Sequence, residues 1–245
     1  MLKTKARESV MQGAAALSSG KVDVVQFALL QELQYYLEML EKHIDLVDRR
    51  LLKGEKIPHS EKVFSIFEAH TEWISKGKMH KSVELGHNTA IATDQYHLIL
   101  DFEIMFQTSD AAVGMQMGKR IINSYGTDYW LRSMSFDRGF YSSLTKEVLS
   151  RAIDQVIMPK RGRKTLAQAQ QEQEQEYQHL RRAHSAVESN INQLEHNGLN
   201  RCPDKGVRGF KRYIALGIVS YNLHRLGRLL IQAEQADKNK ARKVA

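Results

Sequence analysis

The sequence is poor in cysteine and lacks any long apolar run. Its single cysteine, Cys202, excludes an internal disulfide, as is usual for proteins of reducing compartments. No apolar stretch reaches the roughly 18 residues that a membrane-spanning helix needs. Residues 1–21 carry positive charges without a long apolar core, which argues against a signal peptide. We therefore expect a cytoplasmic chain without a membrane partner.

Negative charge is in deficit. The 245 residues include 36 Lys and Arg against 28 Asp and Glu, which gives a net charge of +8. A chain of this length can form one large domain or two small ones, each with a real core. The positive excess favours a polyanionic partner, most simply nucleic acid. On charge alone, a basic surface that binds nothing charged remains the alternative.

Residues 22–52 carry a regular apolar pattern. Seven aliphatic side chains recur at alternating steps of three and four: Leu30, Leu33, Leu37, Leu40, Ile44, Val47 and Leu51. This heptad seam predicts a long amphipathic helix or a coiled-coil arm. Gly54 and Pro58 would end it. We assign residues 1–58 to a helical arm.

Residues 59–158 alternate between strand and helix patterns. We expect, in order, a strand over 63–67, a hairpin over 83–106 with its turn at 94–96, a helix over 110–124, a strand over 131–136, a helix over 144–152 and a strand over 155–158. Two strands separated by one helix indicate a parallel β-α-β unit. The predicted fold class is therefore α/β with a mixed sheet.

The character of the chain changes after Pro159. A basic loop leads into a Gln- and Glu-rich segment of one or two helices, which Gly198 would end. A second loop precedes a strongly amphipathic last helix that begins near Phe210. Residues 236–245 are polar and basic, and we expect them to form a disordered tail.

Asp137 is the first candidate functional residue. It follows the predicted strand over 131–136 and precedes the flexible Gly139 in the segment SFDRGFYS. In open α/β sheets, ligand sites lie at the carboxyl ends of strands. The alternative is a turn residue whose carboxylate hydrogen-bonds its own loop. For Asp137 taken alone, that alternative is favoured.

Glu188 is the second candidate. It flanks the apolar stripe of its predicted helix and shares a face with Arg181 and His184. The carboxylate could be a ligand, or it could form an ordinary ion pair within the helix. His184 and Glu188 have the i, i+4 spacing of some zinc sites, but no Cys/His cluster nearby supplies the remaining ligands.

Basic residues cluster around both candidate acids in the sequence. We assign two groups to DNA contacts, the first made of Lys160, Arg161, Arg163 and Lys164 and the second of Arg181 and Arg182. A third group follows within residues 201–212. Each group alone could be a solvated face. Together they suit a groove for the phosphate backbone beside a metal site.

Several segments together resemble a known family. They include SFDRGFYS, VIMPKRGR and RRAHSAVESNINQLEHNGLNRCPDKG. Over roughly residues 33–230, the chain resembles the C-terminal part of bacterial insertion-sequence DDE transposases, in the group catalogued as not yet classified. The resemblance implies an RNase H-like fold that acts on double-stranded DNA, both transposon ends and target. Such a chain would associate with the nucleoid.

The resemblance also implies a metal site. In this family two aspartates and a glutamate bind two Mg²⁺ ions, which activate water and then a DNA 3′-hydroxyl. Asp137 matches the second aspartate of the family and Glu188 matches the glutamate, so both are expected to be catalytic metal ligands. His184 and Glu195 stand near the places where relatives carry Tyr, Arg and Lys around that glutamate, so this signature is not reproduced.

The chain departs from the family pattern at its front. The first family aspartate lies on a strand that precedes a helical insertion, whereas Asp23, Asp45 and Asp48 all fall at or within the predicted arm. We therefore expect residues 1–58 to be a remnant of the insertion and residues 59–235 to be the C-terminal part of the RNase H-like domain. Without the third carboxylate, we expect an inactive, truncated transposase with an incomplete magnesium site. The alternative is a catalytically silent DNA-binding or dimerising remnant, and in either case a homodimer is a further expected assembly.

Overall fold

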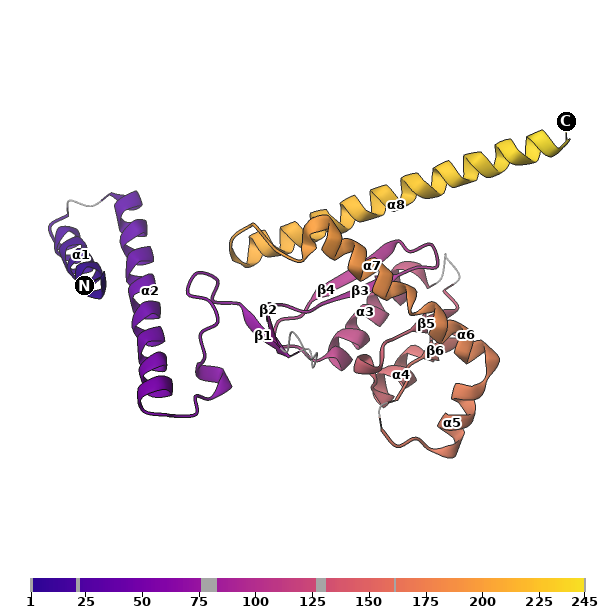
Figure 1. Cartoon of the computed structure of the whole chain (residues 1–245), viewed down its shortest axis with the longest axis horizontal. Helices are drawn as coiled ribbons and strands as arrows, with labels where there is room; N and C mark the ends of the chain where they lie inside the picture. Colours follow the sequence, from indigo (N-terminus) through magenta and orange to yellow (C-terminus); the bar gives the residue numbers. More distant parts are fainter. Residues whose placement is uncertain (1, 21–22, 76–82, 127–130, 161, 245) are drawn as a thin grey trace. The chain divides into compact units, whose positions relative to one another are not determined.

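The computed structural model describes residues 2–20, 23–75, 83–126, 131–160 and 162–244. It is a mixed α/β structure that is mostly helical and has small sheets (Figure 1). The chain divides into two compact units, Met1–Gly86 and His87–Ala245. The predicted boundary at residue 58 differs from this division, because the residues just after it form a hairpin within the first unit.

The first unit begins with a pair of helices. α1 (Leu2–Ser18) packs against α2 (Val24–Val47). A Cβ built on Gly13 would lie 2.4 Å from Leu30 Cδ1, so the glycine permits the close approach of the two helices. Arg7 and Glu41 join them by an ion pair of 2.5 Å.

The predicted helix over 22–52 is confirmed by α2 and the π-helical turn η1 (Asp48–Leu52) that continues it. Asp23 starts α2 with a capping box, in which its carboxylate accepts from the Gln26 backbone N–H at 2.7 Å. Within the predicted helical arm, α1 was not expected as a separate helix. The arm is consequently a helical hairpin rather than a single long helix.

A short antiparallel hairpin follows the arm. β1 (Glu72–Ser75) pairs with β2 (Val83–Gly86). The 3₁₀ turn η2 (His59–Glu61) precedes it. The predicted strand at Val63–Phe67 is wrong, because that segment has no ladder partner and is irregular. A strand requires a neighbour for its backbone groups, and the adjacent β1 has found one.

The predicted hairpin over 83–106 is confirmed around its turn only, because Val83–Gly86 pairs with β1 in the first unit. The second unit starts with the two strands on either side of that turn. β3 (Thr89–Thr93) pairs antiparallel with β4 (Ile99–Ile104). The turn lies at Asp94, whose carboxylate accepts from the backbone N–H groups of Tyr96 and Leu98 at 2.8 and 2.9 Å. This side-chain turn is the reason the chain reverses here.

The predicted helix and β-α-β unit are also confirmed. α3 (Asp110–Tyr125) is followed by β5 (Ser133–Ser135), α4 (Ser143–Leu149) and β6 (Gln155–Ile157). β5 and β6 are parallel, as a helical crossover requires. Within the described residues, no ladder joins this pair of strands to β3 and β4.

The polar segment after β6 forms three short helices and a turn. They are α5 (Leu166–Gln173), α6 (Gln175–Ala183), α7 (Ala186–Leu194) and the π-helical turn η4 (Glu195–Leu199). Gly198 ends this run in a left-handed conformation, with φ of 103°. Tyr213 Oη donates to the Gly198 carbonyl at 3.1 Å and holds the turn in place.

α8 (Gly206–Val244) is the last element. The predicted disordered tail is wrong, since the helix continues through residues 236–244. Ala, Lys and Arg, which together are frequent in this segment, are good helix formers. Lys238 Nζ also lies 3.9 Å from Glu234 Oε2 one turn earlier. Among the described residues, no helix is both long and apolar enough to cross a membrane.

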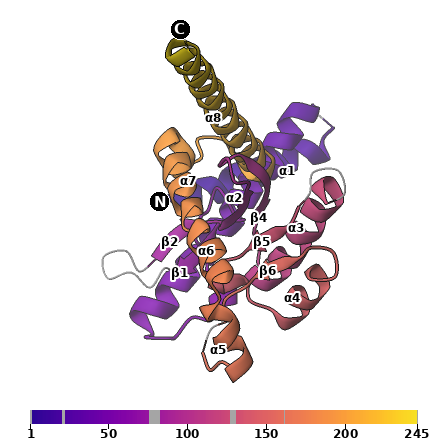
Figure 2. The same ribbon diagram turned by 90° about the vertical axis from the view of Figure 1, so that its right-hand side faces the viewer.

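The core of the second unit lies on both sides of its strands. α3 and α4 cover one side, and α6 and α7 lie on the other (Figure 2). On the α3 side, Val113 is fully buried and packs in a cluster with Met105 and Ala90. On the other side, Ile214 and Tyr221 of α8 pack in a cluster with strand residues of β4. The strands are therefore the middle layer of this unit.

Candidate functional site

Asp137 lies directly after β5, where a functional carboxylate was predicted. The Phe136 N–H donates to the Ile157 carbonyl of β6 at 2.8 Å and the Phe140 N–H donates to the Asp137 carbonyl at 3.1 Å, so the backbone is fixed on both sides. The Asp137 side chain is exposed and makes no capping hydrogen bond to the 3₁₀ turn η3 (Arg138–Phe140) that it precedes. The turn-capping alternative is therefore not what the structure shows.

Glu188 lies in the first turn of α7, and its side chain is exposed. The alternative of an ion pair within the helix would require a basic partner. Arg181, the neighbour considered for that role, instead approaches Glu172 at 3.7 Å. Across the described ranges, Glu188 has no basic group within ion-pair distance. Its carboxylate is thus available to a ligand.

His184 is affected electrostatically by both acids. It lies at the junction of α6 and α7, and burial lowers its pKa below the ordinary value of 6.5. The carboxylate of Asp137, a hydrogen bond to the Ser135 backbone and the carboxylate of Glu188 act in the opposite direction. Asp137 and Glu188, which come from different elements, therefore both act electrostatically on this imidazole, although in the described residues the three side chains do not form a group that could hold a metal ion. Because burial keeps His184 neutral near pH 7, its ring does not cancel their negative charge.

The lowered pKa of His184 predicts a pH dependence of stability. The unfolded chain takes up a proton at this residue at a higher pH than the folded chain does, so acidification below 6.5 favours unfolding. We expect the His184→Gln variant to lose less stability than the parent chain between about pH 7.5 and about pH 5.5. Urea unfolding at both values measures the difference. His179→Gln, at an exposed position on α6, should follow the parent chain. If all three proteins lost the same free energy of unfolding between the two pH values, the pH dependence would not come from His184.

The structure limits the ligand set at this site. In the part of the chain that is described, no group of three or more His, Cys, Asp or Glu side chains could hold a metal ion. The strand acids Asp101 and Glu103 lie elsewhere, bound to Arg120 at 2.9 and 2.8 Å. Among the described residues, Asp137, His184 and Glu188 do not form such a group either, so the zinc alternative for His184 gains no support.

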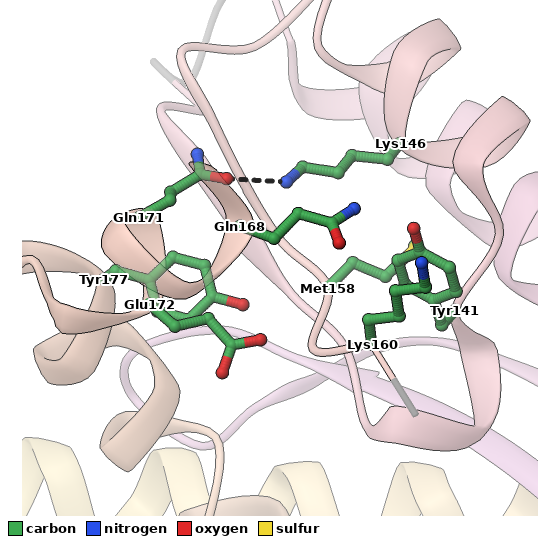
Figure 3. Close-up of a pocket in the computed structure, with 8 residues that line it drawn as sticks. All are labelled: Tyr141, Lys146, Met158, Lys160, Gln168, Gln171, Glu172 and Tyr177. Atoms are coloured by element: carbon green, nitrogen blue, oxygen red, sulfur yellow. Dashed lines mark hydrogen bonds between the residues drawn. The ribbon is translucent and has the colours of Figure 1, made fainter. Parts of the chain in front are cut away.

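The basic residues occupy two different settings. Lys160 lines a small pocket together with Tyr141, Lys146 and Tyr177 (Figure 3). Lys146 Nζ donates to Gln171 Oε1 at 3.0 Å across that pocket. Lys146 was not predicted, because its segment has only the pattern of an ordinary short helix. The pocket brings α4 and α5 together beside the end of β6.

Two of the predicted DNA contacts are already engaged. Lys164 lies 2.5 Å and Arg181 3.7 Å from the carboxylate of Glu172, whose side chain is only 13% exposed. Burial is the main cause that raises the pKa of Tyr177, and the negative charge of Glu172 raises it further. Glu172 thus compensates part of the positive charge of this surface and holds the basic loop against α5 and α6.

The remaining predicted cations are more open. Arg163 and Arg182 are both exposed. Arg182 reaches back to Gln178 Oε1 on its own helix at 3.4 Å, a weak restraint. Arg161 lies outside the described residues. The structure therefore leaves Lys160, Arg163 and Arg182 as the cations best placed for an anionic ligand.

The candidate site consists of two exposed carboxylates that both act electrostatically on His184, and the predicted DNA contacts include the exposed Arg163 and Arg182. Comparison with known proteins adds nothing to this geometry. No family model, no curated protein and no solved structure matches the chain.

Proposed function

We propose that this chain is a DDE-type transposase polypeptide with an RNase H-like catalytic fold, and that it does not complete DNA strand transfer by itself. The observation that carries the proposal is that both acids are exposed and, in the described residues, neither makes the local contact that was its alternative role. Both carboxylates also act electrostatically on His184, although they come from separate segments of the sequence.

The order of elements supports the same proposal. An antiparallel hairpin, a helix and a parallel β-α-β unit follow one another in the second unit. An RNase H-like sheet would place a further strand between β3 and β5. Each of these strands has one edge without a ladder in the described residues, and the buried Ser135 hydroxyl has no hydrogen-bond partner there.

The two carboxylates suit magnesium in kind. Mg²⁺ prefers oxygen ligands and usually keeps several waters, so one or two carboxylates can hold it. When bound, it would lower the pKa of a coordinated water and neutralise charge on a phosphate. Asp137 and Glu188 would supply the ligand oxygens. The hydrogen bond between His184 and the Ser135 backbone would hold the imidazole in its position. With no third acid grouped beside them in the described residues, binding should be weak.

The neighbouring cations would orient the nucleic acid. Lys160, Arg163 and Arg182 are placed to neutralise phosphates, and each such contact makes binding weaker as salt rises. Phosphate contacts of this kind fix the position of a duplex without reading its sequence. The net charge of +8 adds a favourable long-range field.

The metal site gives the first test of the proposal. We expect the purified chain to bind Mn²⁺, a paramagnetic substitute for Mg²⁺, and each of the variants Asp137→Asn and Glu188→Gln to weaken this binding by about tenfold or more. Electron paramagnetic resonance measures free Mn²⁺ directly. Glu147→Gln is the matched control, since this exposed acid of α4 pairs with Arg151, which lies just beyond the end of that helix. If both site variants bind Mn²⁺ as the parent chain does, the site assignment fails.

The same protein separates the two functional candidates. A catalytically silent DNA-binding remnant is favoured by the absence of a group of three ligands in the described residues. Such a remnant would bind a short fluorescent duplex in a salt-dependent way without binding Mn²⁺. Cleavage and joining of DNA by this chain with Mg²⁺ would refute the proposed inactivity, and no DNA affinity at low salt would count against both candidates.

A further inference from the structure

α8 has two apolar faces, and the fold uses only one of them. Ile214, Ile218 and Tyr221 are buried on the inner face. Tyr221 Oη lies 2.9 Å from Asn190 Oδ1 of α7. Beyond this region, α8 runs on past the other elements of the second unit (Figure 1).

A second apolar row lies on the outer part of the same helix. Its members recur at steps of three, four, three and four, and we call them the α8 seam: Leu216, Val219, Leu223, Leu226 and Leu230. They are 61%, 53%, 65%, 45% and 59% exposed, respectively. Alternating steps of three and four are the a and d positions of a coiled coil. Five large aliphatic side chains in a continuous exposed row are unusual on a monomer surface.

The flanks of the seam identify the kind of partner. The positions that would border a facing helix are Ala215, Ser220, Asn222, Gly227 and Leu229, and none carries a charge. A second copy of this basic chain can therefore approach the seam without like-charge repulsion at its borders. A nucleic acid finds no cations on these border positions.

The space beside the seam fits a close partner. A Cβ built on Gly227 would have no atom within 4 Å, so this glycine leaves room where a facing side chain could enter. A glycine inside a helix is less favourable than alanine, which favours a specific reason for its presence. Two seams packed together would bury on the order of 1,000 Å² in total, which is near the lower limit for a specific interface.

We propose that the α8 seam pairs with the α8 seam of a second copy, so that the chain forms a two-stranded helical homodimer. This proposal is independent of the proposed function, because it uses neither the acid pair nor the basic surface. It assigns the dimer contact to α8 rather than to the predicted heptad seam over 22–52, whose Leu30 already packs against Gly13 of α1 within one chain.

The test is the oligomeric state of the full chain. Analytical ultracentrifugation over a range of concentrations should show a species of twice 28.1 kDa, with a dissociation constant on the order of micromolar. The double variant Leu223→Glu/Leu230→Glu should raise that constant by at least about tenfold. Both side chains are exposed in the single chain, so the circular dichroism spectrum should be unchanged.

A matched variant distinguishes the two helical surfaces. Leu51→Glu/Leu52→Glu places the same charges on η1, where Leu51 is 74% and Leu52 is 81% exposed. This variant should leave the dimer intact. A parent chain that is monomeric at all concentrations would overturn the proposal. So would dissociation by the η1 variant with no effect of the α8 variant. A monomer that sediments with anionic vesicles would overturn it in favour of a lipid surface.

Discussion

Replacement of Leu149 by alanine is expected to lower the free energy of unfolding by about 3–5 kcal/mol. Leu149 has no exposed surface and lies at the centre of a cluster with Ile153 and Val156. Its removal would leave a cavity that the rigid β-α-β unit can fill only in part. Since small domains are stable by about 5–15 kcal/mol, this loss is a large fraction of the total. Urea unfolding followed by circular dichroism measures it.

The close fit between Leu149 and Gly118 of α3 provides the control for this prediction. A Cβ built on Gly118 would lie 2.8 and 2.9 Å from the two Cδ atoms of Leu149. Gly118→Ala should therefore be less favourable in the parent chain than in the Leu149→Ala background, where space has been created. Strict additivity of the two substitutions would contradict the contact. Leu144→Ala, at a 62% exposed position near the start of α4, should change stability little.

Replacement of Asn222 by alanine is expected to cost about 2–4 kcal/mol. The Asn222 side chain of α8 accepts from the Ile99 backbone N–H at 2.8 Å and donates to the Ile99 carbonyl at 2.8 Å. Its amide thus acts like one residue of a neighbouring strand at the start of β4. Alanine would leave both backbone groups without these bonds beside the buried Ile99 side chain.

Two further variants separate the bonds of Asn222 from its packing. Asn222→Asp keeps the acceptor and loses the donor, so it should fall between the parent chain and Asn222→Ala. Asn192→Ala, at an exposed position of α7, serves as the control and should be nearly neutral. The amide of Ile99 should exchange faster in Asn222→Ala, and unchanged exchange would argue that these two bonds do not stabilise the start of β4.

Much of the second unit could be predicted from local patterns. Asp94 and its neighbours carry the chemistry of a turn between two β-rich runs, and Pro159 marks the end of β6. The helix over 110–125 has a clear apolar period and a serine cap at Ser109. In these elements the local signal and the final packing agree, so the sequence was sufficient.

Other elements depend on partners that are distant in the sequence. Val63–Phe67 is as β-rich as β1, but only β1 finds a strand to pair with. α1 has weak amphipathic character, and it is placed by the contact of Gly13 with Leu30. The last residues of α8 look disordered by composition, yet they extend a helix that is already nucleated. A window of sequence cannot report any of these contacts.

The candidate site shows the same limit. The sequence located Asp137 and Glu188, but it could not decide between ligand and local roles. The structure bears only on the local roles, since Asp137 makes no cap hydrogen bond and Arg181 approaches Glu172. The ligand role of both acids stays a prediction. His184 was considered only as a zinc ligand, because its position between two elements is a property of the tertiary fold.

The separation of the strands into two pairs affects how the second unit holds together. No ladder joins β3–β4 to β5–β6 in the described residues, whereas α3 contributes Val113 to the cluster over the first pair and Ile122 to the cluster over the second. Side-chain packing has no directional register like that of a hydrogen-bonded ladder. The two halves are therefore coupled by side-chain packing, through α3 and through Phe140, which also packs against the first cluster. A partial opening can release one pair of strands while the other remains folded.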